Sequence, residues 1–386
     1  MTVSDITRTQ FPFLTSLEGR VDAEPRRVLL RVATDIFVND PAPSRAAIAE
    51  FEKAAVKLLS DRDPVTRLVV ARKLAPRIDT PPAVLAAIIA GGNDAALFVL
   101  ERAVAAPRDL LVAAAGGDAA AALAVARRRD LDDEVVGVLV MHPAREIALA
   151  LAMNLAAPLA PERFALLAER ARDDRSLAEA LLARPTAALD QAPLFMFANL
   201  EQRKAILLAA LRAELGRLPG QSTWRAPDDA VRRLESYALA RQPDLLIEAL
   251  AEALGCETAF ARRIVDEPSG EPLAIALAEL AASQEASMRI LLLGHSPLNL
   301  DTTRLGALTR LKDGLRPAAA RRVMSAMIGA QRRHAATVKP AHEPSSTASS
   351  RAISAPAGRP NIEAPQGFKR RRAAQIVVGG RVVRES

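Results

Sequence analysis

The sequence predicts an all-α protein in which short antiparallel helix pairs stack into an α-solenoid, followed by a disordered C-terminal tail. Half of the 386 residues are hydrophobic but only 3% are aromatic. Ala, Leu and Val must therefore form the core, and Ala and Leu favour helices. A capping residue followed by apolar residues at helical spacing recurs along the first half of the chain. Beyond residue 336 the chain is rich in Pro and Ser without apolar periodicity, which is typical of disorder.

The N-terminal region predicts a flexible segment, residues 1–24, and two amphipathic helices within residues 25–59. Its start lacks the basic residues and apolar run of a signal peptide. No apolar stretch of about 18 uncharged residues occurs, so no membrane span is expected. The single cysteine, Cys256, excludes an intrachain disulfide and fits a reducing compartment. These features predict a cytoplasmic protein.

The next segment, DRDPVTRLVVARKLA from residue 61, has two possible interpretations. Asp61 and Asp63 match the D-x-D pattern of haloacid-dehalogenase-type phosphotransferases, whose nucleophilic aspartate follows a buried parallel strand. The preceding FEKAAVKLLS has helical rather than strand periodicity, so that context is missing. Asp63 is therefore predicted to be a helix N-cap, with Pro64 at the first helical position.

The same cap-and-helix pattern recurs and predicts a series of repeats over residues 25–188. The intervals of roughly 24 to 31 residues are typical of a solenoid, and the further caps are Asn93, Asp118, His142 and Asp173. Shorter partner helices are expected from Thr80, Pro107, Asp132 and Pro161. Such helix pairs bury their apolar faces only by stacking. The fifth and seventh residues after the caps are the predicted core, including Leu68, Val70, Leu123, Val125, Ile147 and Leu149.

The helix after Asp63 also carries a family resemblance. It resembles the second half of a HEAT-type repeat, whose positions are occupied by Asp63, Pro64, Arg67, Ala71 and Leu74. The short period is similar to that of the leucine-rich-variant repeat, and residues 25–335 resemble the bacterial domain of unknown function 2336 family. This resemblance implies a HEAT-like helical fold and specifies no activity. Leu97 and Ala122 stand where Arg67 would recur, so a continuous Asp–Arg ladder is not expected.

Two regions follow the repeats. Residues 189–336 have helical periodicity but do not align with the first five repeats, which leaves degenerate repeats or a separate helical cap as alternatives. Residues 337–386 are predicted to be a disordered basic tail. From Lys339 onward nine Lys or Arg residues oppose three acidic residues, so this tail carries most of the formal net charge of +7. The helical body is therefore nearly neutral.

No set of residues with catalytic or metal-binding spacing emerges. Gly294-His295-Ser296 resembles a nucleophile elbow, but Leu298 replaces the second glycine and a helix precedes it. The four histidines are scattered, without the pairing of a metal site. Glycine motifs that cradle phosphates are missing. No catalytic, metal-binding or cofactor-binding residue is therefore predicted, no cofactor is expected, and the protein is expected not to be an enzyme.

Cations near the ends of the predicted repeat helices offer a candidate binding surface. The ninth residue after each of the first three caps is an arginine, and the row comprises Arg72, Arg102 and Arg127, with Lys73, Arg128 and Arg129 beside it. Stacked helices lie about 8–10 Å apart, so these side chains are placed to line a groove for an acidic partner. Alternatively, cations in a last helical turn complement the helix dipole.

The tail holds a second candidate binding element, over residues 375–384. Two β-branched runs are separated by Gly379-Gly380, which is a hairpin signal, and a basic run precedes them: Lys369, Arg370, Arg371 and Arg372. An isolated hairpin is marginal in water. We therefore expect Ile376, Val377 and Val378 to gain order on the sheet edge of a partner. The alternatives are a solvated charge cluster and a hairpin that folds back on the protein's own body.

Three functions fit this pattern. The first is a non-enzymatic scaffold or adaptor that binds protein partners through its solenoid surface and tail. The second is a nucleic-acid-binding protein or DNA glycosylase-type enzyme, which needs a cationic face and aromatic side chains. The near-neutral body and the single Trp224 and Tyr237 disfavour it, so only weak, non-specific contact by the tail is expected. The third, a lyase or chaperone for a tetrapyrrole, rests on fold analogy alone.

Overall fold

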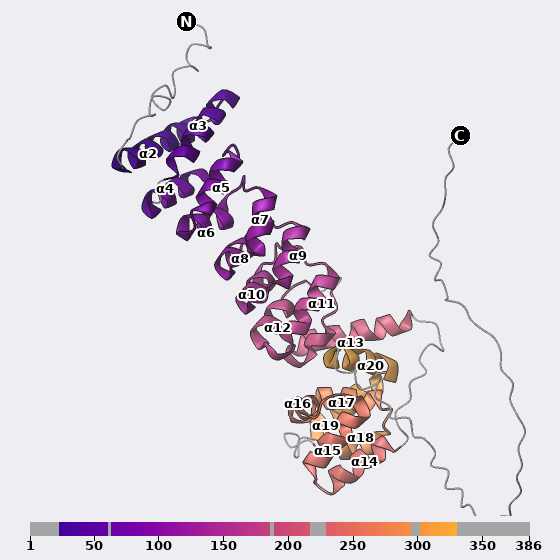
Figure 1. Ribbon diagram of the computed structural model, residues 1–386. Coiled ribbons are helices and arrows are strands. Elements are labelled where there is room, and N and C mark those ends of the chain that lie inside the picture. The colour runs from indigo at the N-terminus through magenta and orange to yellow at the C-terminus, as the bar shows by residue number, and fades with distance from the viewer. Residues whose placement is uncertain (1–22, 61–62, 186–188, 217–228, 295–301, 330–386) are drawn as a thin grey trace, which may run out of the picture. The chain divides into compact units, whose positions relative to one another are not determined.

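The computed structural model describes residues 23–60, 63–185, 189–216, 229–294 and 302–329. Within these ranges it contains helices and no β-strand (Figure 1). The predicted all-α class is therefore confirmed for the part of the chain that is described. No helix there is long and apolar enough to cross a membrane. Residues 1–22 and the whole predicted tail lie outside the described ranges.

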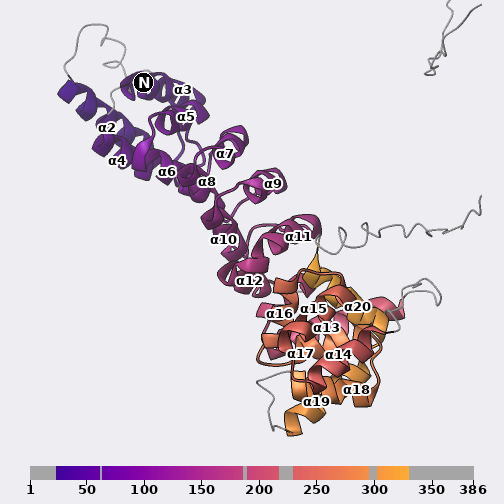
Figure 2. The same cartoon turned by 60° about the horizontal axis from the view of Figure 1, so that its bottom comes forward.

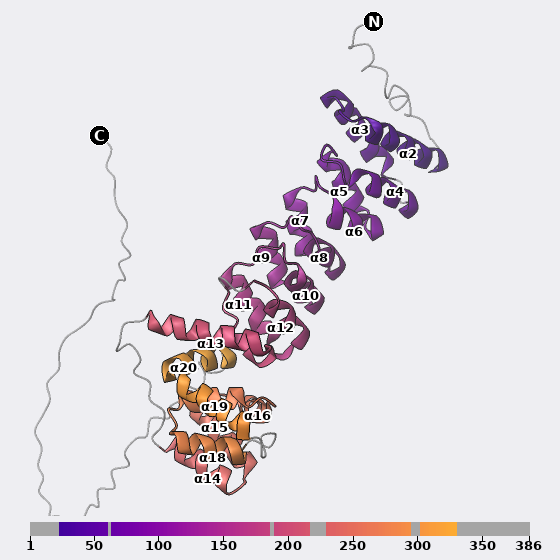
Figure 3. The same ribbon diagram turned by 180° about the vertical axis from the view of Figure 1, so that it is seen from behind.

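Up to residue 185 the chain forms short helices that alternate between two layers (Figures 2 and 3). The first layer contains α3 (Arg45–Leu58), α5 (Pro82–Ala90), α7 (Arg108–Ala115), α9 (Asp133–Met141) and α11 (Pro161–Arg170). The second contains α2 (Ala23–Asn39), α4 (Pro64–Leu74), α6 (Asn93–Arg102), α8 (Ala119–Ala126), α10 (Arg145–Met153) and α12 (Arg175–Leu182). Each second-layer helix packs against the next one in that layer.

The start of α4 shows the structural role of Asp63. The Asp63 carboxylate accepts a hydrogen bond from the Thr66 backbone N–H at 2.8 Å, and Pro64 occupies the first turn. Hydrogen bonds from the side chain and backbone of Thr66 hold the pKa of Asp63 below its usual value. The preceding element is helix α3, not a strand. Asp63 is therefore the predicted N-cap, while Asp61 lies outside the described residues.

Three of the predicted caps are displaced by one or two residues. Gly92 caps α6, Ala144 caps α10 and Asp174 caps α12, whereas Asp118 caps α8 as predicted. At α6 the turn requires positive φ at two consecutive residues, 67° at Gly92 and 62° at Asn93. Glycine adopts this region without strain and asparagine tolerates it. Asn93 therefore sits inside the helix boundary instead of before it.

The buried stripe of the second layer follows a different register from the predicted one. Val70, Val125 and Ile147 are buried as predicted, but Leu68, Leu123 and Leu149 are only partly buried, so that half of the prediction is wrong. The seventh and eighth residues after each observed cap are buried in all five helices from α4 to α12: Val70 and Ala71, Val99 and Leu100, Val125 and Ala126, Leu151 and Ala152, Leu181 and Leu182. Each of these helices packs against neighbouring helices of both layers. The side chains at the seventh and eighth positions are buried in these contacts.

A hydrogen-bond donor after each of the second-layer helices α4 to α12 binds carbonyl groups at the end of the previous helix in that layer. The Arg128 guanidinium donates to the carbonyl oxygens of Leu100 at 3.0 Å and Ala103 at 2.9 Å. The equivalent donors at the other junctions are the side chains of Arg77, Asn154 and Arg184 and the backbone N–H of Val104. The last carbonyls of a helix have no partner within it, so these donors satisfy buried acceptors at every step.

The helices from residue 189 onward pack differently. They are η2 (Ala192–Phe197), α13 (Leu200–Leu215), α14 (Ala230–Leu239), α15 (Pro243–Leu254), α16 (Thr258–Asp266), α17 (Glu271–Glu279), α18 (Gln284–Gly294), α19 (Thr302–Gly314) and α20 (Pro317–Ile328). Helix α17 contacts α16, α18, α19 and α20 and is buried from Pro272 to Glu279, so it lies at the centre of this group. Pairs distant in sequence, such as α14 with α18, pack together.

The buried side chains form two separate clusters. The smaller runs from Leu30 to Ala103 and includes a stacked pair, Phe37 and Phe51, with ring centroids 4.2 Å apart. The larger runs from Leu100 to Ile328. The boundary between the two clusters therefore lies at the end of α6.

Candidate protein-interaction surface

The predicted arginine row is exposed but is not a continuous line of positive charge. Because Gly92 rather than Asn93 caps α6, the ninth residue after that cap is Glu101, between Arg72 on α4 and Arg127 after α8. Glu101 accepts a hydrogen bond from Arg102 at 2.9 Å, and its other oxygen lies 3.9 Å from Arg127 Nη1. Two arginines of the row therefore share one carboxylate.

The remaining predicted cations have different surroundings. The Arg72 guanidinium lies over the Phe98 ring, 5.9 Å from its centroid. Lys73 pairs with Asp35 on α2. Arg128 is 4% exposed and binds the α6 carbonyls, so it is part of the core architecture rather than of an open surface. Arg129 is exposed. The tail candidates lie outside the described residues: Lys369, Arg370, Arg371, Arg372, Ile376, Val377 and Val378.

An apolar row runs beside these cations. The fifth residue after each observed cap of α4, α6, α8 and α10 is a half-buried leucine: Leu68, Leu97, Leu123 and Leu149. On α10 the ninth residue after the cap is also apolar: it is Met153, which is 67% exposed. The leucines are visible in the sequence, and Leu68, Leu123 and Leu149 are predicted core residues, whereas Leu97 is not. Packing uses the seventh and eighth positions, so stacking leaves this row partly open.

Acidic residues occupy the other edge of the same helices. The first turns or caps of α6, α8, α10 and α12 carry Asp94, Asp118, Glu146 and Asp174. Acids at helix N-termini and cations at C-termini both complement the helix dipole. Arg145 binds Asp174 and lowers the pKa of that carboxyl. The apolar row thus has a negative edge and a mixed, partly positive edge.

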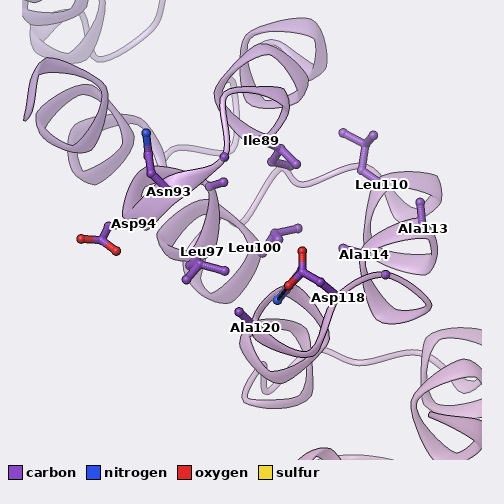
Figure 4. A pocket seen from close by; sticks show the side chains of 14 residues that line it. Ile89, Asn93, Asp94, Leu97, Leu100, Leu110, Ala113, Ala114, Asp118 and Ala120 are labelled. Atoms are coloured by element: carbon purple, nitrogen blue, oxygen red, sulfur yellow. Dashed lines mark hydrogen bonds between the residues drawn. The ribbon is translucent and has the colours of Figure 1, made fainter. Parts of the chain in front are cut away.

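A groove of about 480 Å³ opens between α6 and α8 (Figure 4). Its walls come from the end of α5, from α6, from α7 and from the start of α8. The larger apolar side chains lining it are Ile89, Leu97, Leu100 and Leu110, and alanines line much of the rest. Ile89 packs against both core clusters, so the groove lies where the two clusters meet. Asp94 and Asp118 are its charged lining residues.

Comparison with known proteins assigns part of the chain to a family. Residues 96–219 match the model of a family described as Uncharacterised protein conserved in bacteria (DUF2336). This segment is a DUF2336 region. The predicted family resemblance is confirmed over these residues, which run from α6 to α13 and include most of the groove. No curated protein and no solved structure matches the chain.

A buried polar cluster ties the DUF2336 region to a later turn. Arg203 on α13 donates to Ser269 Oγ at 2.6 Å, Glu271 at 2.8 Å and Glu267 at 2.9 Å. Burial alone would raise the pKa of Glu267, but hydrogen bonds from Ser269 and Arg203 outweigh it and lower the pKa. Sequence reasoning missed this cluster, because its members lie 64 to 68 residues apart and form no local motif.

The groups with catalytic or metal-binding potential are dispersed. Within the described ranges no three His, Cys, Asp or Glu side chains gather as a metal site would require. His142 accepts a hydrogen bond from the Ala144 N–H at 3.2 Å and lies 3.3 Å from the Gly117 carbonyl oxygen, so it links two turns of the DUF2336 region. Cys256 packs at the margin of the larger core.

Proposed function

We propose that this chain is a non-enzymatic helical-repeat scaffold that binds a segment of a protein partner along helices α4 to α10. The observation that carries the proposal is the row of half-buried leucines, Leu68, Leu97, Leu123 and Leu149, on four consecutive stacked helices. A partly exposed apolar strip that continues across a stacked array suits a binding surface. A cytoplasmic location belongs to the same proposal.

The repeated contacts support an α-solenoid of HEAT-like repeats over residues 25–188. The buried pair at the seventh and eighth positions and the donor after each helix recur at every step from α4 to α12. Residues 189–336 act as a separate helical cap in this proposal, since α17 is surrounded by α16, α18, α19 and α20 instead of stacking in chain order. The tail, residues 337–386, supplies a second, basic attachment element.

The charges beside the row indicate the chemistry of the partner. An amphipathic segment places its apolar side chains on the leucines, its basic residues toward Asp94 and Asp118, and its acidic residues toward Arg72 and Arg127. Such complementarity sets orientation and speeds encounter more than it adds affinity. Apolar contact with the row therefore supplies most of the binding energy.

The test uses the full chain carrying a photo-crosslinking amino acid at position 123, with partners captured from the producing bacterium and identified by mass spectrometry. Leu149→Glu places a charge on the row at a half-buried position and is expected to abolish capture. Leu239→Glu is the matched control, because Leu239 lies on α14 and is 56% exposed. Equal capture by both variants contradicts the proposal.

The counter-test measures nucleic-acid binding by fluorescence anisotropy with duplex and single-stranded oligonucleotides. We expect only weak binding that falls steeply with salt and disappears when Lys369, Arg370, Arg371 and Arg372 are replaced by serine, because each neutralised phosphate releases a counterion. Binding by the replaced variant at physiological ionic strength would favour a nucleic-acid function over the scaffold.

A further inference from the structure

We propose that the groove between α6 and α8 is the anchor site for the partner segment, and that it takes an apolar side chain followed by a lysine or arginine. This inference rests on the proposed scaffold function and names the chemistry of the residues that enter the groove. Three properties of the groove carry it: its apolar space, its uncompensated acids and its continuity with the leucine row.

The apolar space is large enough for one or more bulky side chains. A volume of about 480 Å³ lies within the range of about 300–1,000 Å³ typical of ligand clefts. Its small lining residues include Ala113 and Ala120, both exposed. Gly92, which lines the groove, faces open space, so no side chain of the described residues fills this part of it.

The charged lining residues are both acidic. In Figure 4 the Asp118 carboxylate lies beside Leu100, whereas the Asp94 carboxylate, also part of the lining, points away from the other lining residues. Asp118 accepts one hydrogen bond, from the Ala121 N–H at 2.9 Å. Within the described residues neither carboxylate has a cationic partner, whereas Asp132 and Asp174 pair with Arg108 and Arg145. A cation entering the groove therefore meets the Asp118 carboxylate close to an apolar wall, where charge pairing is screened less than in open water, and Asp94 adds negative charge at the same groove.

The groove is continuous with the leucine row, and this favours a protein segment as its occupant. Leu97 lines the groove and is also the α6 member of the row. A chain that follows the row consequently passes the groove and can insert one side chain there. An amphipathic segment with a basic residue next to a large apolar residue satisfies both surfaces at once.

The experiment uses two synthetic amphipathic peptides as probes, one built from leucine and lysine and the other from leucine and glutamate. Their affinities for the full chain are measured by isothermal titration calorimetry. We expect the leucine–lysine peptide to bind more tightly. Replacing both acids, Asp94→Asn with Asp118→Asn, should weaken its binding about tenfold, in keeping with the loss of a partly desolvated ion pair at Asp118 and of the negative charge of Asp94. Asparagine preserves the N-cap at position 118, so folding is retained.

Two further variants localise the effect. Asp63→Asn is the matched control, since Asp63 also caps a second-layer helix but lies outside the groove; it should leave the affinity unchanged. Ala113→Trp fills the groove from an exposed position and should abolish binding of the leucine–lysine peptide. Unchanged binding by Ala113→Trp, or equal binding of the leucine–glutamate peptide, overturns the inference.

The outcomes separate this inference from the scaffold proposal. If Leu149→Glu abolishes partner capture while the groove variants do not affect it, the scaffold stands and the anchor site is wrong. If none of these variants affects capture, both proposals fail. Sedimentation equilibrium supplies a last outcome: self-association that Ala113→Trp abolishes would assign the groove to a second copy of the chain and overturn the peptide anchor.

Discussion

Two adjacent arginines show how far the role of a residue depends on its surroundings. Arg127 and Arg128 follow α8 in the run RRR. Arg127 projects to solvent near Glu101, while Arg128 is buried and holds the end of α6. An ion pair with Asp130 at 2.6 Å also holds the Arg128 guanidinium. The same chemical group thus serves the surface at one position and the core at the next.

Arg128→Ala should lower the free energy of unfolding by about 1–3 kcal/mol, because it leaves the carbonyls of Leu100 and Ala103 without their donor. Arg127→Ala is the control and should change it by less than about 0.5 kcal/mol, as most exposed substitutions do. Urea denaturation followed by circular dichroism measures both. Similar values for the two variants would contradict the capping role.

The polar cluster of Arg203 predicts a pH dependence. The pKa of Glu267 is lowered in the folded state, so the folded chain binds fewer protons there than the unfolded chain does. The resulting stability is present above the unfolded pKa and is lost as the pH falls through the folded pKa. Glu267→Gln should therefore lower the free energy of unfolding at pH 7. The difference in this free energy between the variant and the parent protein should shrink as the pH falls below about 4.

Urea titrations at neutral and acidic pH test this dependence. Glu252→Gln is the control, because Glu252 pairs with Arg233 at an exposed site where its side chain is 69% accessible, and exposed pairs contribute little. If the difference in free energy of unfolding between Glu267→Gln and the parent protein stays constant with pH, the charge of the Glu267 carboxylate does not contribute to stability.

At the scale of the element, helical period and tertiary packing select different residues. The recurrence of apolar residues at the fifth and seventh positions after a cap predicts both as core, although residues two apart on a helix lie about 200° apart and do not share a face. In the structure the seventh and eighth positions are buried. The fifth position is only partly buried, and its leucines form the row. The candidate binding surface is therefore a direct consequence of how each helix is packed.

Ile147→Ala should lower the free energy of unfolding by about 2–5 kcal/mol, since Ile147 is fully buried in α10 and truncation leaves a cavity. Leu149→Ala, two residues further along the same helix, should cost less than about 1 kcal/mol because Leu149 is only partly buried. Chemical denaturation of both variants compares them. If Leu149→Ala lowered the free energy of unfolding more than Ile147→Ala does, the observed burial of these two residues would be contradicted.

At the scale of the whole molecule, the division of the core into two clusters has thermodynamic consequences. In a repeat array each element is stabilised mainly by its neighbours, so a defect in one cluster acts there first. Phe51 belongs to the smaller cluster and Phe164 to the larger. The groove lies at the boundary between the two clusters.

Phe51→Ala should accelerate amide hydrogen exchange in α2 to α5 while α10 to α12 stay protected, because the loss of about 3–5 kcal/mol falls on the smaller cluster. Phe164→Ala should produce the reverse pattern. Hydrogen exchange measured by mass spectrometry on the full chain resolves these segments. Uniform acceleration across both clusters in either variant would show that the described helices unfold as one unit.

The sequence was informative wherever the deciding interaction is local. The all-α class follows from composition and helical period, and the caps at Asp63 and Asp118 follow from side-chain hydrogen bonds that span only three residues. The displaced cap of α6 has a local cause as well. The positive φ at Gly92 and Asn93 moves that helix boundary by one position without changing the apolar period.

Tertiary structure alone decided the features on which the proposed site depends. Whether Arg127 or Arg128 is buried depends on the position of the α6 carbonyls, more than 20 residues away. The partners of Arg203 are separated from it by more than 60 residues, and the groove exists only because two helix pairs meet there. The sequence by itself determined which segments are helical, because a helix is made of contacts within one or two turns. Which of their faces stay open to a partner was decided by the neighbouring helices, since exposure is a property of what covers a residue.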